Sequence, residues 1–160
     1  FNAGPDQGEI VIHPQSVIHS MVSYRDGAVL AQLGAPDMKT PIAVAMGFSE
    51  RINSGVAPLD FTKVGTLTFK QPEPERYPCL YLGIEASKQG QACTTALNAA
   101  NEEAVAAFLQ EKLSFLGISE VVEAVLNQLS GERAHSLEEI LAVDAKSRQL
   151  AQAEIAKRGR

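Results

Sequence analysis

Tryptophan is absent from this 160-residue sequence, cysteine occurs only twice, and there is no excess of positive charge, since the formal net charge is −5. Proteins that bind the nucleic-acid backbone need clustered Lys and Arg, so no nucleic-acid partner is expected. The longest uncharged, apolar-rich run, residues 89–101, is too short and too polar to span a bilayer, so no membrane partner is expected either. Two cysteines and no recognisable signal peptide fit the reducing cytoplasm.

Proline is missing from the second half of the chain. All eight prolines lie within residues 1–78, whereas the remainder is rich in Ala, Leu, Glu and Gln. The hydrophobic fraction of 45% is that of a globular protein with a core of its own. The chain begins at Phe1 without Met, which is typical of a processed product or an excised fragment. We expect two architectures joined end to end.

The first block contains a hairpin pattern. The β-rich run 16–24 predicts a strand, and residues 29–33 predict its returning partner. Between them, Asp26-Gly27 predicts a two-residue turn in which both central residues have positive φ. Apolar residues fall on both faces of the outgoing strand, so we expect the hairpin to pack on both sides.

The rest of this block is less regular. Residues 9–13 predict a short strand, and residues 37–46 predict a helix with Pro41 in its first turn. From residue 47 to residue 78 only the run 66–69 alternates like a strand. A long linker that lies against another surface is the simplest interpretation.

The second block predicts helices with short connections. Residues 79–88 predict a helix that Gly90 ends, and the next helix is expected to start at Asn98 or Asn101 and to reach about residue 112. The buried stripe of that second helix is expected at Val105, Phe108 and Leu109.

Two further helices complete the predicted bundle. Ser119 is expected to cap the third helix, and Ser136 with Glu139 forms a capping box for the last, which ends near the basic pair Lys157-Arg158. The inward residues of the third helix are expected to be Val121, Val122, Val125, Leu126 and Leu129. Four helices of this kind form a bundle.

General catalytic motifs are missing: there is no glycine-rich phosphate loop after a strand, no nucleophile elbow, and no Cys or His cluster with metal-ligand spacing. One local group stands out, in which His13, Ser16 and His19 lie about a strand junction broken by Pro14. An imidazole titrates near neutrality, so one histidine could donate a proton or contact an anion. The alternative, which the residues alone favour, is that both histidines are structural and hydrogen-bonded.

The polar residues between positions 98 and 103, and Met38, each allow two interpretations. Asn98, Asn101, Glu102 and Glu103 could include a catalytic carboxylate, but acids at a helix start normally interact with the dipole, so capping is preferred. Met38 is either a core residue or an adaptable contact for a flat ring.

Longer stretches resemble one enzyme family. The run His13–Val22, followed by Asp26-Gly27, Ala31–Gly34 and Pro36-Asp37-Met38, closely resembles 1-deoxy-D-xylulose 5-phosphate reductoisomerase. The resemblance continues through Asn53–Val56, Pro58–Phe61, Arg76–Leu80, Gln89–Gln91 and Thr94–Glu102. It covers essentially the whole chain, but only roughly the last two-fifths of a complete family member.

The resemblance implies an α+β fold in three parts. Residues 1–47 would be the distal part of the central catalytic and dimerisation domain and would supply a hairpin of its sheet. Residues 48–77 would be the long crossing linker, and residues 78–160 the C-terminal helical bundle. The last boundary agrees with the end of the proline-containing block.

The family reaction rearranges a ketose phosphate and reduces the product with NADPH, which gives 2-C-methyl-D-erythritol 4-phosphate for isoprenoid precursor synthesis. Mg²⁺ or Mn²⁺ polarises the carbonyl and orients the substrate oxygens. The family's carboxylate metal ligands and phosphate-binding residues would lie upstream of Phe1. No catalytic residue and no metal ligand is therefore assigned here, and the 160-residue chain alone is expected to hold no cofactor and to be inactive.

Four residues are assigned by resemblance. His19, and with it Ser16, would line the pocket of the phosphate-bearing substrate. Met38, with Pro36, would cover the nicotinamide ring and keep water from the hydride path. The family is a homodimer in which the central-domain sheets meet, so residues 9–34 are expected at the interface. A free-standing, noncatalytic α+β module that dimerises or binds a partner through the hairpin is the alternative.

Overall fold

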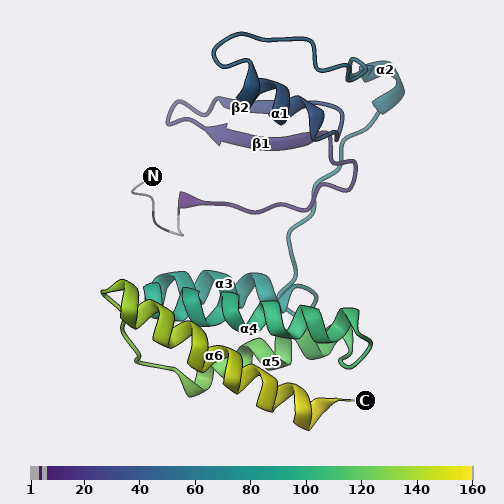
Figure 1. Cartoon of the computed structure of the whole chain (residues 1–160). Helices are drawn as coiled ribbons and strands as arrows, with labels where there is room; N and C mark the ends of the chain where they lie inside the picture. Colours follow the sequence, from purple (N-terminus) through teal and green to yellow (C-terminus); the bar gives the residue numbers. More distant parts are fainter. Residues whose placement is uncertain (1–3, 5–6, 160) are drawn as a thin grey trace. The chain divides into compact units, whose positions relative to one another are not determined.

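The computed structural model describes residue 4 and residues 7–159. Most of the segment Phe1–Pro5, on which the expectation of a processed product or an excised fragment was based, lies outside the described residues. The chain divides into two compact units, drawn in Figure 1. We call Ile10–Pro72 the hairpin unit, and Glu73–Arg160 with the residues before Ile10 the helical unit. In the described part, no helix is long and apolar enough to cross a membrane.

The hairpin unit is built on the antiparallel strands β1 (Ile18–Ser23) and β2 (Val29–Leu33), as predicted. Its loop is longer than predicted. The Tyr24 amide donates to the Ala28 carbonyl at 2.8 Å, so three residues connect the strands, and only Gly27 among them has a positive φ, of 89°. Asp26 instead accepts a hydrogen bond from the Ala28 amide at 2.9 Å, which closes the loop through its side chain.

The hairpin unit has almost no core. Val17, 6% exposed, is the only buried residue in Ile10–Pro72. Val22 and Leu30, which pair directly across the strands, are 55% and 63% exposed, and Met21 on the other face is also exposed. No helix of this unit has a close backbone contact with either strand. Within the hairpin unit, both faces of the ribbon are therefore uncovered.

Two helices flank the irregular part of this unit. α1 (Lys39–Met46) confirms the predicted helix and holds Pro41 in its first turn, where the missing amide has no helical partner. α2 (Phe61–Val64) was not predicted; Asp60 caps it by accepting a hydrogen bond from the Thr62 amide. Four residues are too few to show a helical period, so only the cap could have indicated α2.

The helical unit is the predicted bundle, formed by α3 (Pro78–Gln89), α4 (Gln91–Leu109), α5 (Phe115–Gln128) and α6 (Leu137–Arg158). Figure 1 shows these four helices together, and α4 packs against each of the other three.

A single residue, Gly90, joins α3 to α4. Its φ of 109° and ψ of −168° lie in a region that glycine alone occupies readily, so the predicted stop of the first helix is confirmed. The next helix begins at once, and the predicted start at Asn98 or Asn101 is wrong. No proline or glycine interrupts residues 91–97, so α4 extends back to Gln91, directly after Gly90.

The remaining helix starts depend on serine caps. Ser114, not Ser119, caps α5 by accepting a hydrogen bond from the Gly117 amide at 3.0 Å. Ser119 lies inside the helix and donates to the Leu116 carbonyl at 2.9 Å. The capping box of Ser136 and Glu139 at the start of α6 is confirmed.

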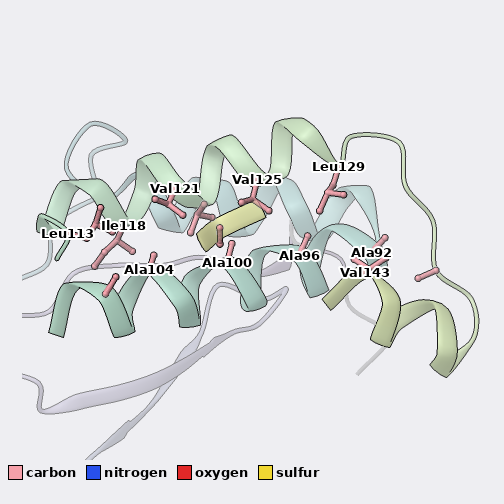
Figure 2. Packing of buried hydrophobic residues seen from close by; sticks show 14 residues of the cluster. Ala92, Ala96, Ala100, Ala104, Leu113, Ile118, Val121, Val125, Leu129 and Val143 are labelled. Carbon is pink, nitrogen blue, oxygen red and sulfur yellow. The ribbon is translucent and has the colours of Figure 1, made fainter. Parts of the chain in front are cut away.

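The core of the helical unit consists of alanines on α4 packed against the valine-rich face of α5, as Figure 2 shows. Ala96, Ala100 and Ala104 recur every fourth residue and are each 0% exposed. Because these side chains are small, backbones can approach closely along this stripe. Leu109 was predicted in the stripe but is 74% exposed, because the alanines and not the largest apolar residues define the buried face. Of the predicted inward residues, Val121, Val122 and Val125 on α5 and Leu129 at its C-cap are buried, and Leu126 is partly buried.

A buried carboxylate links α6 to α5. Glu154, 6% exposed, accepts hydrogen bonds from Lys157 at 2.8 Å and from Gln128 of α5 at 3.3 Å, and it pairs with Arg158. The hydrogen bonds from Lys157 and Arg158 lower the pKa of Glu154 to about 2. The basic end of α6 thus forms ion pairs in addition to its favourable position at the helix dipole.

Candidate functional site

The predicted site residues all lie in the hairpin unit. Ser16 is exposed and has a φ of 50°, a left-handed value that residues other than glycine rarely adopt. Its amide donates to the His13 carbonyl at 3.1 Å, which closes a turn. After this turn, Val17 enters the interior and Ile18 begins β1.

His19 occupies a bulge in β1. Ile18 pairs with Leu33 and Ser20 pairs with Gln32, so His19 is an extra residue in its strand. Bulges redirect side chains and are common beside functional sites. The exposed His19 ring lies next to Gly34, since a β-carbon at that position would be 3.9 Å from the ring Cε1.

The segment after β2 carries the other two predicted residues. The Gly34 amide donates to the Val17 carbonyl at 3.0 Å, which continues the pairing beyond the last residue of β2. Asp37 then accepts a hydrogen bond from the Lys39 amide at 2.9 Å and forms a tight turn before α1. Pro36 is exposed, and Met38, at the start of α1, is 70% exposed. Of the two interpretations of Met38, the core residue is therefore wrong.

Backbone pairing thus places the beginning of segment 34–38 beside segment 16–19. Across residues 4 and 7–159, no hydrogen bond or ion pair joins the side chains of Ser16, His19, Pro36 and Met38 to one another. Chemically, the imidazole and the hydroxyl can hydrogen-bond an oxygen-rich anion, whereas the pyrrolidine ring and the thioether offer an apolar contact to a flat ring.

The other histidine of the motif has different surroundings. His13 Nδ1 lies 2.9 Å from the Thr68 carbonyl oxygen, and the ring stacks on Phe69 with centroids 4.9 Å apart. Because a carbonyl only accepts, Nδ1 of the ring carries a proton and donates it to Thr68. Nε2 is buried and has no hydrogen-bond partner within the described part of the chain. The interpretation of His13 as a hydrogen-bonded structural residue therefore applies to Nδ1 and not to Nε2.

Gln15 binds the same linker residue. Its Oε1 accepts a hydrogen bond from the Thr68 amide at 3.2 Å, and its Nε2 donates to Thr68 Oγ1 at 2.9 Å. Two backbone hydrogen bonds, of 2.8 and 3.0 Å, form an isolated bridge between Ile12 and Lys70. We call these contacts of residues 12–15 with residues 68–70 the linker clamp. The sequence interpretation missed it, although two short β-rich runs outside the hairpin were visible.

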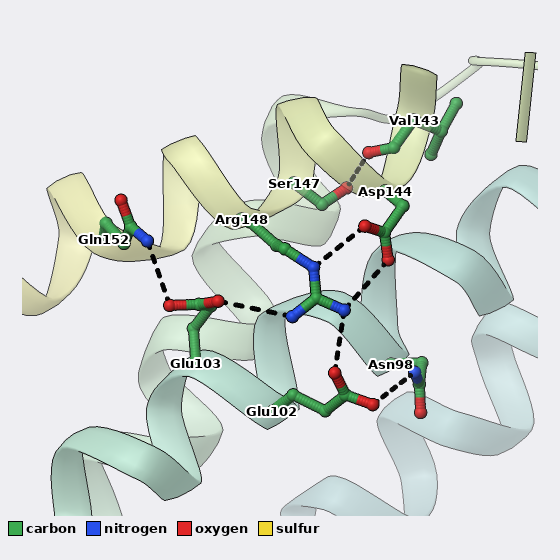
Figure 3. Close-up of polar contacts among 8 residues, drawn as sticks. All are labelled: Asn98, Glu102, Glu103, Val143, Asp144, Ser147, Arg148 and Gln152. Atoms are coloured by element: carbon green, nitrogen blue, oxygen red, sulfur yellow. Dashed lines mark hydrogen bonds and ion pairs between the residues drawn. The ribbon is translucent and has the colours of Figure 1, made fainter. Parts of the chain in front are cut away.

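The polar residues of α4 have a structural role, which Figure 3 shows. Arg148 of α6 donates to Glu102 at 2.7 Å and to Glu103 at 3.3 Å, and on its own helix it pairs with Asp144 at 2.8 Å. Asn98 donates to Glu102 at 3.1 Å. The hydrogen bond from Arg148 lowers the pKa of Glu102. The capping interpretation is therefore wrong, because all four residues lie within α4, where Glu102 and Glu103 bind α6.

The donors present do not fit a divalent ion. No group of three or more His, Cys, Asp or Glu side chains in the described ranges could hold a metal. The two cysteines are free; Cys79 is exposed, with its thiol pKa raised by desolvation, and Cys93 is buried. We assign no catalytic step through a metal to the residues of this chain.

The structure combines a hairpin that carries a bulged histidine, an exposed methionine and a helical bundle. Comparison with known families tests whether this combination belongs to the family that the sequence resembles. Residues 33–150 match the model of the DXP reductoisomerase C-terminal domain, and the chain belongs to this family. Pro36 and Met38 fall inside the matched range.

Two similar relatives are reductoisomerases by name. The 1-deoxy-D-xylulose 5-phosphate reductoisomerase of Idiomarina loihiensis is 61% identical over 148 residues, which are 92% of this chain and 37% of that protein. The enzyme of Tolumonas auensis is 59% identical over 155 residues, 97% of this chain and 39% of that protein. The resemblance predicted from the sequence is confirmed.

Solved structures confirm the α+β fold. The reductoisomerase from Zymomonas mobilis in complex with NADPH has a TM-score of 0.83 and 46% identity, covering 92% of this chain and 39% of that one. A reductoisomerase in complex with NADPH, fosmidomycin and magnesium has a TM-score of 0.84 and 47% identity, covering 91% and 38%. The chain thus spans less than two-fifths of the length of these relatives.

Proposed function

We propose that this chain is the C-terminal part of an NADPH- and divalent-metal-dependent reductoisomerase, which converts 1-deoxy-D-xylulose 5-phosphate to 2-C-methyl-D-erythritol 4-phosphate for isoprenoid precursor synthesis. The observation that carries the proposal is the 61% identity to a protein of that name over 92% of the chain. Solved relatives that contain NADPH, fosmidomycin and magnesium support the cofactors. Sparse cysteine supports a cytoplasmic location.

In this proposal, His19 and Ser16 contact the phosphate-bearing substrate as hydrogen-bonding groups. Support comes from the exposure of both side chains and from the bulge that redirects His19. Gly34 leaves the edge of the imidazole ring open, because it adds no side chain beside it. Neither residue is assigned a bond-making step.

Met38 and Pro36 cover the nicotinamide ring in the same proposal. Met38 is 70% exposed and flexible, so its thioether can settle on a flat ring and exclude water from it. When bound, NADPH supplies the hydride and the divalent ion polarises the substrate carbonyl. The residues of this chain position and shield; the ligands for the ion would belong to other parts of the enzyme.

The domain assignment remains a prediction: residues 1–47 as part of the central domain, 48–77 as the linker and 78–160 as the helical domain. The boundary between the two units, at Pro72 and Glu73, falls within the predicted linker and supports it. The clamp on residues 68–70 ties much of that linker to the hairpin unit.

A homodimer through the hairpin is also proposed. Its support is the apolar surface on both faces of the ribbon, including Val22, Leu30 and Met21, which would be covered in a dimer. The alternative of a free-standing partner-binding module would use the same surface. Membership of the reductoisomerase family favours the enzyme.

Turnover tests the proposal directly. The complete enzyme that contains this chain should oxidise NADPH when given 1-deoxy-D-xylulose 5-phosphate and Mg²⁺, and the 160-residue chain alone should not. A complete enzyme that leaves NADPH unchanged under these conditions would refute the activity. Turnover by the chain alone would refute the assignment of the metal ligands to other parts of the protein.

The pocket assignment has its own test. In the complete enzyme, His19→Ala should raise KM for the ketose phosphate and lower kcat/KM by about 10-fold or more, because a hydrogen bond to a charged group is lost. His135→Ala, at an exposed histidine of the helical unit, is the matched control and should leave both constants unchanged. Equal kinetics for the two variants would return His19 to a structural role.

A further inference from the structure

The linker clamp lies immediately before the strand that carries His19. Three residues of the segment 12–15 take part. The Ile12 backbone bonds Lys70, and the His13 ring bonds Thr68 and stacks on Phe69. Gln15 binds Thr68 through both ends of its amide. Thr68 lies 55 residues after His13 and 53 residues after Gln15 in the sequence. The contacts therefore join distant parts of the hairpin unit.

Few other interactions determine where β1 begins. The unit buries only Val17, and no helix of the unit covers the ribbon. Between the clamp and His19 the chain passes through Ser16, whose left-handed backbone is unfavourable for a residue with a side chain. Such a conformation persists only when its flanks are fixed. Here the clamp fixes one flank, and the hydrogen bond from Gly34 to Val17 fixes the other.

From this arrangement we propose that His13 and Gln15 are positioning residues: by holding Thr68 of the linker, they fix the start of β1 and so the orientation of His19. The inference rests on the proposed function, in which His19 contacts the substrate. The clamp reaches His19 through the Ser16 turn, whose amide donates to the His13 carbonyl, and through the bulge in β1.

The geometry of the His13 contact selects the test variants. Asn places an amide nitrogen near the position of Nδ1, so His13→Asn can still donate to the Thr68 carbonyl. Gln places that nitrogen further out, nearer Nε2, so His13→Gln should lose the bond with little change in polarity. The pair therefore separates the Nδ1 contact from a general effect of removing the ring.

Hydrogen exchange of the 160-residue chain measures the clamp itself. The Thr68 and Lys70 amides, which donate to Gln15 and Ile12, should exchange about 3- to 10-fold faster in His13→Gln and in Gln15→Ala, and close to the wild-type rate in His13→Asn. The Gly27 amide, in the distant hairpin loop, is the internal reference. Unchanged exchange in both His13→Gln and Gln15→Ala would overturn the clamp.

Kinetics of the complete enzyme measure the positioning. His13→Gln should raise KM for the ketose phosphate by about 2- to 10-fold, and His13→Asn should restore it, with His135→Gln as the control. In a His19→Ala background the same His13→Gln substitution should have no further effect, since it acts through His19.

The outcomes separate the two proposals. Additive effects of His13→Gln and His19→Ala would overturn positioning, and so would a KM unchanged by His13→Gln. A wild-type enzyme without turnover would refute the proposed function and, with it, the action through His19, whereas the exchange measurement would still decide the clamp.

Discussion

Helices α4–α6 bury a continuous apolar cluster in which Ala96, Ala100, Val121 and Val125 are fully inaccessible, whereas the hairpin unit buries Val17 alone. The helical unit is thus held by packing, and its polar pairs add to a core that already exists. The hairpin unit is held by local turns, one strand ladder and the linker clamp. An isolated two-stranded ribbon is marginally stable at best, so this unit has little stability of its own.

Separating the units should give the largest effect. A peptide of residues 73–159 should keep its helical circular dichroism and unfold cooperatively, because its whole core lies within it. A peptide of residues 10–72 should show no cooperative transition, since one buried side chain cannot offset the entropy of ordering the backbone. Cooperative melting of the 10–72 peptide would contradict the conclusion that only the helical unit is held by a core of its own.

Within the helical unit, a core truncation should destabilise strongly. Leu129→Ala, at a residue 2% exposed, should lower the free energy of unfolding by about 2–5 kcal/mol, because it removes apolar contacts and leaves a cavity. Leu109→Ala, at a residue 74% exposed, is the matched control and should change it by less than about 0.5 kcal/mol. Urea denaturation followed by helical circular dichroism measures both; equal losses would show that packing is not concentrated as described.

The Glu154 ion pairs should make the stability of the helical unit depend on pH below 4.5, with a smaller effect than the core truncation. The pKa of Glu154 is lowered to about 2 from an ordinary value of 4.5, so its stabilising contribution is complete above pH 4.5 and disappears as the pH falls toward 2. The wild type should therefore exceed Glu154→Gln in thermal midpoint at neutral pH, and the gap should close between pH 4.5 and 2.

Glu123→Gln, at an exposed glutamate of α5, is the control for this titration and should show no comparable gap. A gap for Glu154→Gln that stayed constant down to pH 2 would contradict the role of its carboxylate charge.

The smallest effect on helical unfolding is expected from the hairpin surface. The double variant Val22→Gln, Leu30→Gln should change the free energy of helical unfolding by less than about 0.5 kcal/mol, because both residues are exposed and neither belongs to the helical core cluster. In the complete enzyme the same variant should shift sedimentation equilibrium toward the monomer. Met46→Gln, at an 81% exposed residue of α1, is the control; an unchanged dimer in the double variant would move the interface away from these faces.

Local patterns made much of this fold predictable. The Asp26-Gly27 pair located the hairpin, and the Ser136 box located the last helix within one residue. The errors occurred where several local signals compete. Ser114 and Ser119 are both possible caps, and the residues before Asn98 form helix without any cap.

Long-range contacts were not predictable in this way. The His13–Thr68 contact joins residues 55 positions apart, and the Arg148–Glu102 pair joins residues 46 apart; neither leaves a periodic trace in the sequence. His19 and Met38 were located by resemblance, because an exposed histidine and an exposed methionine have no spacing that identifies them. Their roles in binding stay predictions.

At Gly90 the backbone conformation restricts the choice of residue, although the surrounding space does not. A β-carbon there would meet no atom within 4 Å, so no neighbour forbids a larger residue. The obstacle is the backbone itself, since any residue with a side chain would favour other dihedral angles. Such a change would alter the angle between α3 and α4. The direction of α3 relative to α4 therefore depends on the backbone freedom of one glycine and not on any crowding around it.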